Sequence, residues 1–206
     1  MVTLTFEQEI QPGNYTLFLR FIGTLNINKV GFYRESYTND EGEEVWMATT
    51  FFEPIYARQS FPCMDEPALK ATFDIAINHY PNYTALSNMP VLNRSDVDER
   101  DGKIWTTFQR TPPMSTYLVS YVISDFVNVS NSDGTINIWC RKKIVPSLEY
   151  SHNVIQSAVV EVEKYLNSSL PVPKLDNVAV PNVPYIGEEN WGINIFKDSY
   201  LVFNKT

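Results

Sequence analysis

The sequence predicts a mainly β fold, in which antiparallel sheets come first and a helix with further strands follows. Two observations carry this prediction. Short apolar runs separated by turn residues fill the first two-thirds of the chain. One helical pattern then begins near residue 147, and strand-like segments return after it. Many short strands with regular turns favour an antiparallel sheet or sandwich.

The first predicted strand is 15–21, where Tyr15, Leu17, Leu19 and Phe21 alternate with other side chains at the period of a half-buried strand. Further strand-like runs are 72–77, 83–87, 104–110, 117–126 and 136–141. Turn residues separate these runs at Asn39-Asp40-Glu41-Gly42, Asp101-Gly102 and Asp133-Gly134. The N-terminal part is therefore predicted to be an antiparallel β sandwich.

The pattern changes after Pro146. Ser147 is predicted to cap a helix at its N-terminus, and Glu149 stands where a negative charge favours the helix dipole. Apolar residues recur at helical spacing at Ile155, Ala158, Val159, Val162 and Leu166. Asn167-Ser168-Ser169 and two prolines end this helix, and strands are predicted at 177–180 and 191–203. We therefore predict one domain over residues 1–143 and the beginning of another over 144–206.

Composition excludes several classes of protein. Charged residues make up 19% of 206 residues and hydrophobic residues 44%, so the chain is expected to be folded. The net charge of −8 argues against nucleic acid as a partner. Cys63 and Cys140 form no metal-ligand spacing and are expected to be buried thiols rather than a disulfide. No apolar run reaches the roughly 20 residues of a membrane span, so any targeting or anchoring segment is expected outside this chain.

Six N-x-S/T sequons indicate a protein that is glycosylated outside the cell. They begin at Asn14, Asn82, Asn93, Asn128, Asn167 and Asn204. An extracellular or cell-surface location is therefore predicted. For the full-length protein we also expect a plasma-membrane anchor outside this chain.

One motif stands out between the predicted strands. Phe52-Glu53-Pro54-Ile55-Tyr56-Ala57-Arg58 runs into Phe61-Pro62-Cys63-Met64-Asp65-Glu66-Pro67-Ala68-Leu69-Lys70-Ala71. Three prolines make this stretch a rigid corner, and from the residues alone most of it is a turn with solvated carboxylates. A second acidic turn is Ile186-Gly187-Glu188-Glu189-Asn190-Trp191-Gly192.

Taken together, these motifs resemble the aminopeptidase N-like zinc peptidases. The first is similar to the family's F-E-P-T-D-A-R-x-x-F-P-C-x-D-E-P, and the second to its G-A-M-E-N-W-G exopeptidase motif. Gly31-Phe32-Tyr33-Arg34, Ala85-Leu86-Ser87-Asn88-Met89-Pro90, Thr111-Pro112-Pro113-Met114 and Pro171-Val172-Pro173-Lys174-Leu175-Asp176 agree with it in order. The resemblance implies a fragment with most of the family's N-terminal β domain and the start of its thermolysin-like catalytic domain.

The resemblance also implies an amine-binding site for peptide substrates. Glu53 matches a carboxylate that helps to bind the substrate's free α-amino group, and Glu189 matches its main anchor. Gly187 and Asn190 belong to the same motif. Glu188 stands where Met usually lines the first side-chain pocket, and would either favour basic first residues or mark lost activity. Two departures weaken the site: Phe51 replaces a usual Gln, and Ile186 replaces the first Gly.

The zinc site of the family is not in this sequence. Relatives hold zinc through H-E-x-x-H and a later Glu, with the first Glu as general base. Only His79 and His152 are present, and neither lies in such a motif, so no metal ligand or catalytic residue is assigned. The zinc motif is expected beyond Thr206, and the chain alone is expected neither to bind catalytic zinc nor to hydrolyse peptides.

Three functions remain open at this point. The first is a fragment of a zinc-dependent aminopeptidase, and the second is a catalytically inactive relative that serves as a binding or adhesion ectodomain. Phe51, Ile186 and Glu188 favour the second, whereas Glu53 and Glu189 favour the first. The third is a free-standing β-rich secreted binding domain. An H-E-x-x-H motif in the downstream codons would eliminate the inactive relative.

Overall fold

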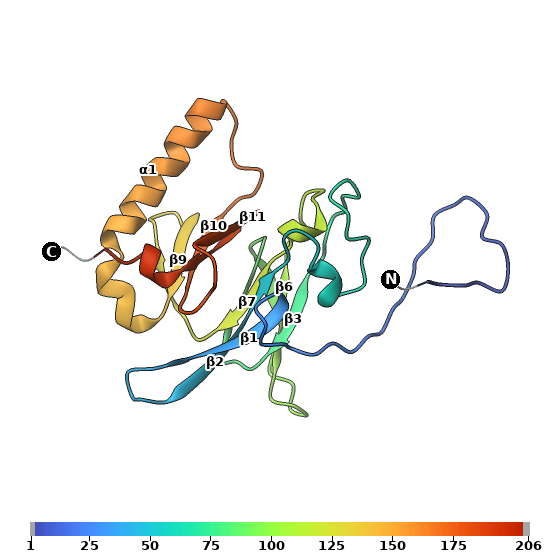
Figure 1. Ribbon diagram of the computed structural model, residues 1–206, viewed down its shortest axis with the longest axis horizontal. Helices are drawn as coiled ribbons and strands as arrows, with labels where there is room; N and C mark the ends of the chain where they lie inside the picture. Colours follow the sequence, from blue (N-terminus) through green and yellow to red (C-terminus); the bar gives the residue numbers. More distant parts are fainter. Residues whose placement is uncertain (1–2, 204–206) are drawn as a thin grey trace.

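The computed structural model describes residues 3–203 and is mainly β, as predicted, with one long helix. A four-stranded antiparallel sheet has the order β1-β2-β7-β4 (Figure 1). Its strands are β1 (Gly31–Thr38), β2 (Glu44–Phe51), β4 (Thr84–Ser87) and β7 (Tyr121–Ser124). The predicted turn at Asn39–Gly42 closes the β1–β2 hairpin, where Gly42 takes a φ of 82°.

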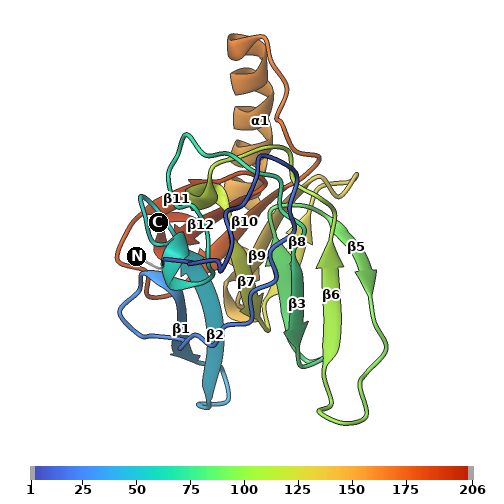
Figure 2. The same cartoon turned by 90° about the vertical axis from the view of Figure 1, so that its right-hand side faces the viewer.

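A three-stranded antiparallel sheet stands beside it, in the order β3-β6-β5 (Figure 2). Its strands are β3 (Ala76–His79), β5 (Val91–Arg94) and β6 (Ile104–Phe108). The predicted turn at Asp101-Gly102 lies between β5 and β6, and Gly102 has a φ of 70°. Short 3-10 helices connect the elements, at η1 (Ala57–Gln59) and η2 (Thr116–Leu118).

The third sheet has five strands in the order β11-β12-β10-β9-β8. These are β8 (Val127–Ser130), β9 (Ile136–Cys140), β10 (Leu175–Val180), β11 (Gly187–Asn190) and β12 (Ile193–Lys197). β10 runs parallel to β9 and to β12, whereas β8–β9 and β11–β12 are antiparallel hairpins. The sheet thus contains strands from both sides of residue 143, and the domain boundary predicted there stays a prediction.

The parallel pairing of β9 with β10 requires a crossover, which α1 (Glu149–Leu166) provides. The helix ends as predicted, at Asn167, which adopts a left-handed φ of 48°. The predicted Ser147 cap is wrong: the N-cap is Leu148, and no side chain caps the helix. Ser147 instead ends the 3-10 helix η3 (Lys142–Ser147), so the chain enters α1 from a conformation that is already helical.

The predicted strand at 15–21 is also wrong. Residues 3–25 contain no strand, and the first part of this segment extends away from the sheets (Figure 1). Its alternating apolar side chains are exposed, Tyr15 by 66% and Phe21 by 52%. Alternation predicts a strand only where a neighbouring strand can complete its hydrogen bonds, and within the described chain none pairs with this segment.

The four-stranded and five-stranded sheets pack face to face over a shared apolar core. Met47, Leu86 and Val122 contribute from one sheet, and Val178 and Ile193 from the other. Burial of such side chains stabilises the fold by about 1.5–3 kcal/mol each. The shared core therefore fixes β11, at the edge of one sheet, relative to the end of β2 in the other.

Both cysteines are free thiols. Cys140 is buried, as predicted, and Cys63 is half-buried. Within residues 3–203, no helix has the length and apolarity that crossing a bilayer requires.

Candidate functional site

The predicted site residues come from two places in the fold. Glu53 follows the end of β2 and is exposed, at a cis peptide bond to Pro54. The others form β11, the edge strand of the five-stranded sheet. Side chains alternate across a strand, so Gly187 and Glu189 face outward.

The two inward side chains of β11, Glu188 and Asn190, are 3% and 4% exposed. In the described structure neither oxygen of the Glu188 carboxyl has a hydrogen-bond partner, and the side-chain nitrogen of Asn190 has none either. An unpaired buried carboxylate is costly, because the protein interior replaces its hydration poorly. A charged Glu188 is therefore unfavourable at this position.

Burial raises the pKa of Glu188 from 4.5 to about 8. The nearby N–H groups of Phe52 and Glu53 lower it, the carboxylate of Glu53 raises it further, and the hydroxyl of Tyr185 lowers it slightly. Glu188 thus lies near the backbone of Phe52 and Glu53. At neutral pH the buried group is mostly a neutral carboxylic acid.

An aromatic stack lies beside these carboxyl groups. The Phe51 ring stacks on Tyr185 with a centroid distance of 4.7 Å and on Tyr56 at 6.4 Å. The hydroxyls of Tyr185 and Tyr33 are 3.5 Å apart, at hydrogen-bond distance. From the sequence, Phe51 was interpreted only as the loss of a hydrogen-bonding Gln. No role was predicted for Tyr56 or Tyr185. The aromatic residues that flank both motifs were the available signal.

Glycines hold the β11–β12 hairpin in close contact with its neighbours. A Cβ at Gly187 would lie 2.8 Å from the ring of Phe196, its partner on β12. A Cβ at Gly192 would lie 2.1 Å from the backbone oxygen of Asn88, and Gly192 has a φ of 78°. The Asn88 side chain donates to the backbone oxygen of Trp191 at 2.8 Å. These contacts place β11 against the β4 side of the four-stranded sheet.

The proline-rich corner after Glu53 is held by Asp65, which is 4% exposed. It accepts hydrogen bonds from the Arg58 backbone and Nε, both at 3.0 Å, and from Thr116 Oγ1 at 2.7 Å. Burial raises the pKa of Asp65, but these hydrogen bonds and the Arg58 charge outweigh it and leave the pKa below its usual range. The motif is thus a structural corner as well as the support for Glu53.

Neither histidine joins a metal site. His79 is buried, with its ring nitrogens at 2.8 Å from Thr106 Oγ1 and 2.9 Å from the backbone oxygen of Tyr80. His152 lies on α1, with Nδ1 at 3.0 Å from Gln156. Over residues 3–203, no three or more His, Cys, Asp or Glu side chains come together as a metal-binding group.

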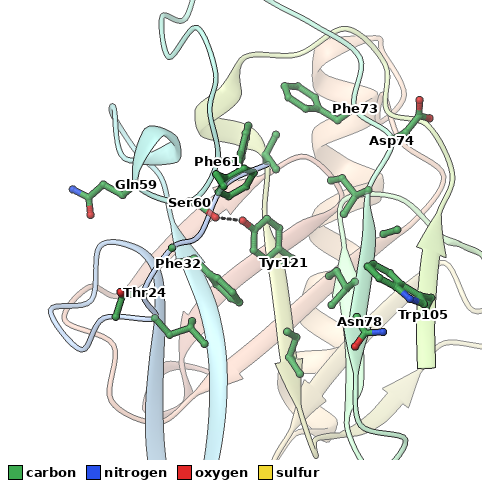
Figure 3. Close-up of a pocket in the computed structure, with 18 residues that line it drawn as sticks. Thr24, Phe32, Gln59, Ser60, Phe61, Phe73, Asp74, Asn78, Trp105 and Tyr121 are labelled. Atoms are coloured by element: carbon green, nitrogen blue, oxygen red, sulfur yellow. Dashed lines mark hydrogen bonds between the residues drawn. The ribbon is translucent and has the colours of Figure 1, made fainter. Parts of the chain in front are cut away.

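A separate apolar groove of about 720 Å³ lies away from these carboxylates. Phe32, Phe61, Phe73, Trp105 and Tyr121 supply its aromatic walls (Figure 3). The only bond drawn in it joins Ser60 and Tyr121, and none of the predicted site residues lines it. Asp74 is the acidic residue in its lining, and this carboxylate is already paired with Arg110 at 2.6 Å.

The relatives of this chain are aminopeptidases. Glutamyl aminopeptidase of Bos taurus is 39% identical over 212 residues, which cover 98% of this chain and 22% of the relative. Aminopeptidase Q of Homo sapiens is 39% identical and aminopeptidase A of Gloydius brevicauda 35%, each over 98% of this chain. The chain therefore spans about a fifth of the length of these relatives. A family model described as the Peptidase M1 N-terminal domain matches residues 1–118, and the chain belongs to the peptidase M1 family.

Proposed function

We propose that this chain is part of a zinc-dependent aminopeptidase that removes N-terminal residues from peptides. In this proposal Glu53 and Glu189 bind the substrate's α-ammonium group. The observation that carries it is the exposure of both carboxylates on two elements fixed by a shared core. A carboxylate–ammonium hydrogen bond contributes about 1.5–3 kcal/mol, and two of them would also orient the first peptide bond.

The free edge of β11 supports the same proposal. Among the described residues β11 pairs with β12 alone, so its other side offers unpaired backbone groups to an extended peptide. Gly187 and Asn190 would contribute this backbone, with Glu189 at its amine end. The aromatic stack around Phe51 would contact the first side chain and favour apolar ones.

The resemblance implies a zinc ion in the whole enzyme, and among residues 3–203 no three or more His, Cys, Asp or Glu side chains come together that would hold it. When bound in the whole enzyme, such an ion would polarise the scissile carbonyl and activate a water. This chain's part in the proposal is confined to binding and orienting the substrate.

Amine binding can be tested on the 206-residue chain. A short peptide with a free N-terminus and its N-acetylated form would be titrated against the chain by NMR. The free peptide is expected to shift the Glu53 and Glu189 resonances, and Glu189→Gln should weaken its binding about tenfold or more. Glu161→Gln, on the exposed face of α1, is the matched control and should change nothing. Equal binding of the acetylated peptide would refute an amine site.

An inactive relative that acts as a binding ectodomain is the second candidate. The unpartnered Glu188, where the family usually has Met, is the observation that favours it. Hydrolysis of an aminoacyl-nitroanilide by the native protein, lost on metal chelation, would eliminate this candidate.

We also propose an extracellular or cell-surface location with N-glycans. The sequon asparagines within the described residues are all exposed: Asn14, Asn82, Asn93, Asn128 and Asn167. Asn204 lies outside the described residues. A loss of mass on treatment with a glycosidase that releases N-glycans would test this, and an unmodified native protein would refute it.

A further inference from the structure

The apolar groove described above follows the edge of a strand. Six consecutive residues, 73–78, line one wall of it, and the last three belong to β3. Successive side chains of a strand point to opposite faces of its sheet, so a space lined by a continuous run follows the edge of the strand. Among the described residues β3 pairs with β6 alone, and its other edge therefore carries unpaired backbone N–H and C=O groups.

The opposite wall of the groove is a face of the four-stranded sheet. Val119, Tyr121 and Ile123 line it at alternate positions, which places their side chains on one face. Phe32 of β1 lies beside them, with its ring 4.9 Å from that of Tyr121. An added strand could thus pair its backbone with β3 and pack apolar side chains on this face. A small apolar ligand would fill the same space but leave the edge of β3 without hydrogen bonds.

The chain itself carries a segment with the properties that this groove requires. Residues 15–21 have the alternation of a half-buried strand, yet within residues 3–203 no strand pairs with them. Leu17 and Leu19, on the same face of this segment as Tyr15 and Phe21, are 56% and 49% exposed. A contiguous apolar surface of this kind marks an interaction site.

The position of this segment favours the groove of a second molecule. Of residues 3–25, Phe21 and 23–25 line the chain's own groove, and the first part of the segment extends away from the sheets (Figure 1). Residues 15–21 span about 23 Å when extended, so they can lie along a neighbour's groove without any change in the sheets. Two copies that exchange the same segment form a closed pair with two-fold symmetry.

We propose that the apolar groove is a docking site for residues 15–21 of a second copy of this chain, which form an additional strand along β3. The exchange is reciprocal, and in each direction it buries Leu17 and Leu19 against Tyr121 and Ile123 of the other copy. It is independent of the proposed amine site, because none of the predicted site residues lines the groove.

Sedimentation equilibrium of the 206-residue chain tests the association. The wild type is expected to form a dimer as its concentration rises. Leu17→Asp combined with Leu19→Asp should weaken dimer formation at least tenfold, because burial of one leucine side chain is already worth about tenfold. Trp105→Ser, which removes an exposed side chain from the groove wall, should weaken it as well.

Tyr165→Asp is the matched control, because it changes an exposed apolar residue on α1, away from the groove. It should leave the dimer unchanged. A wild-type chain that stays monomeric would overturn the proposal. So would a dimer that Tyr165→Asp abolishes and the paired leucine substitutions leave intact, since the apolar face of α1 would then be the interface.

Paramagnetic relaxation enhancement separates exchange between copies from docking within one chain. A spin label at Arg20→Cys, on the opposite face from the leucines, would be carried by a chain with Cys63→Ser, since Cys63 is half-buried. This chain would be mixed with isotope-labelled wild type that carries no spin label. Broadening of the Ile77 and Ile123 amide resonances of the wild type is expected. Broadening that occurs only when both labels are in one chain would show that the segment fills its own groove, and no broadening in either sample would exclude docking; both results would overturn the exchange.

Discussion

Replacing the buried Glu188 with glutamine is expected to stabilise the fold at neutral and alkaline pH. Glutamine has nearly the same shape as the protonated acid but cannot ionise, so the variant removes one titration and little else. In the folded chain the pKa of Glu188 is about 8, against 4.5 for an ordinary glutamate. The folded state therefore binds this proton more tightly than the unfolded chain does.

The direction in which pH changes the stability follows from this difference in pKa. The stability linked to Glu188 is fully present below about pH 4.5 and is lost as the pH rises to about 8. One pKa unit corresponds to about 1.4 kcal/mol, so the whole loss amounts to about 5 kcal/mol, of which about 3 kcal/mol has occurred at pH 7. That is a large part of the 5–15 kcal/mol typical of folded domains.

Urea denaturation of the 206-residue chain at pH 5, 6, 7 and 8 measures this effect through tryptophan fluorescence. The difference in free energy of unfolding between Glu188→Gln and the wild type should increase steadily in favour of the variant from pH 5 to pH 8. Glu189→Gln is the matched control, because it removes the adjacent carboxylate, which faces solvent. If wild type and Glu188→Gln lose stability in parallel from pH 5 to 8, the buried acid does not titrate as the structure implies.

Two further substitutions test the supports of the site by the same denaturation. Gly192→Ala should lower the free energy of unfolding by more than about 3 kcal/mol, because a Cβ there would meet the Asn88 backbone oxygen at 2.1 Å. Gly134→Ala should lower it by only about 1 kcal/mol, since the φ of 75° is the sole obstacle there. Similar losses in both would refute the close approach at Gly192. Asp65→Asn should destabilise the chain by about 2 kcal/mol at pH 7, and the difference from wild type should shrink as the pH falls, because the pKa of Asp65 is lowered in the fold. Asp74→Asn, in an exposed ion pair, should change stability little, and an equal effect of both would contradict the buried network.

Local patterns predicted the elements whose causes are local. The turns at Gly42 and Gly102 require positive φ, and the helix that ends at Asn167 follows the spacing of its apolar residues. The helix start was misplaced because Ser147 lies in a 3-10 helix, which the pattern of capping residues does not reveal. The parallel pairing of β9 with β10 was not predicted either, since strand patterns do not specify neighbours distant in sequence.

The candidate site shows a similar limit. Alternation along Gly187–Asn190 implies that one of the two adjacent glutamates turns inward, but not which one. The face that each side chain takes is decided by the pairing of β11 with β12 and by the burial of that side of the hairpin. Family resemblance identified Glu53 and Glu189 as functional candidates, and they stay predictions. The burial of Glu188 needed the tertiary structure.

The motif Pro171–Asp176 contains a buried ion pair that also helps to position the β11–β12 hairpin. Lys174, 8% exposed, donates to Asp176 at 2.6 Å, to the backbone oxygen of Ser87 at 2.5 Å and to that of Gly192 at 2.8 Å. With three acceptors this ammonium group is fully satisfied, and removal of either charge would leave the other buried and unpaired. The pair therefore ties β4 to the turn of the β11–β12 hairpin at one end of β11. Glu188, which is mostly neutral at pH 7, lies in β11 itself and faces the end of β2. The Lys174–Asp176 pair and the uncharged Glu188 therefore both help to fix β11, the strand that carries Glu189.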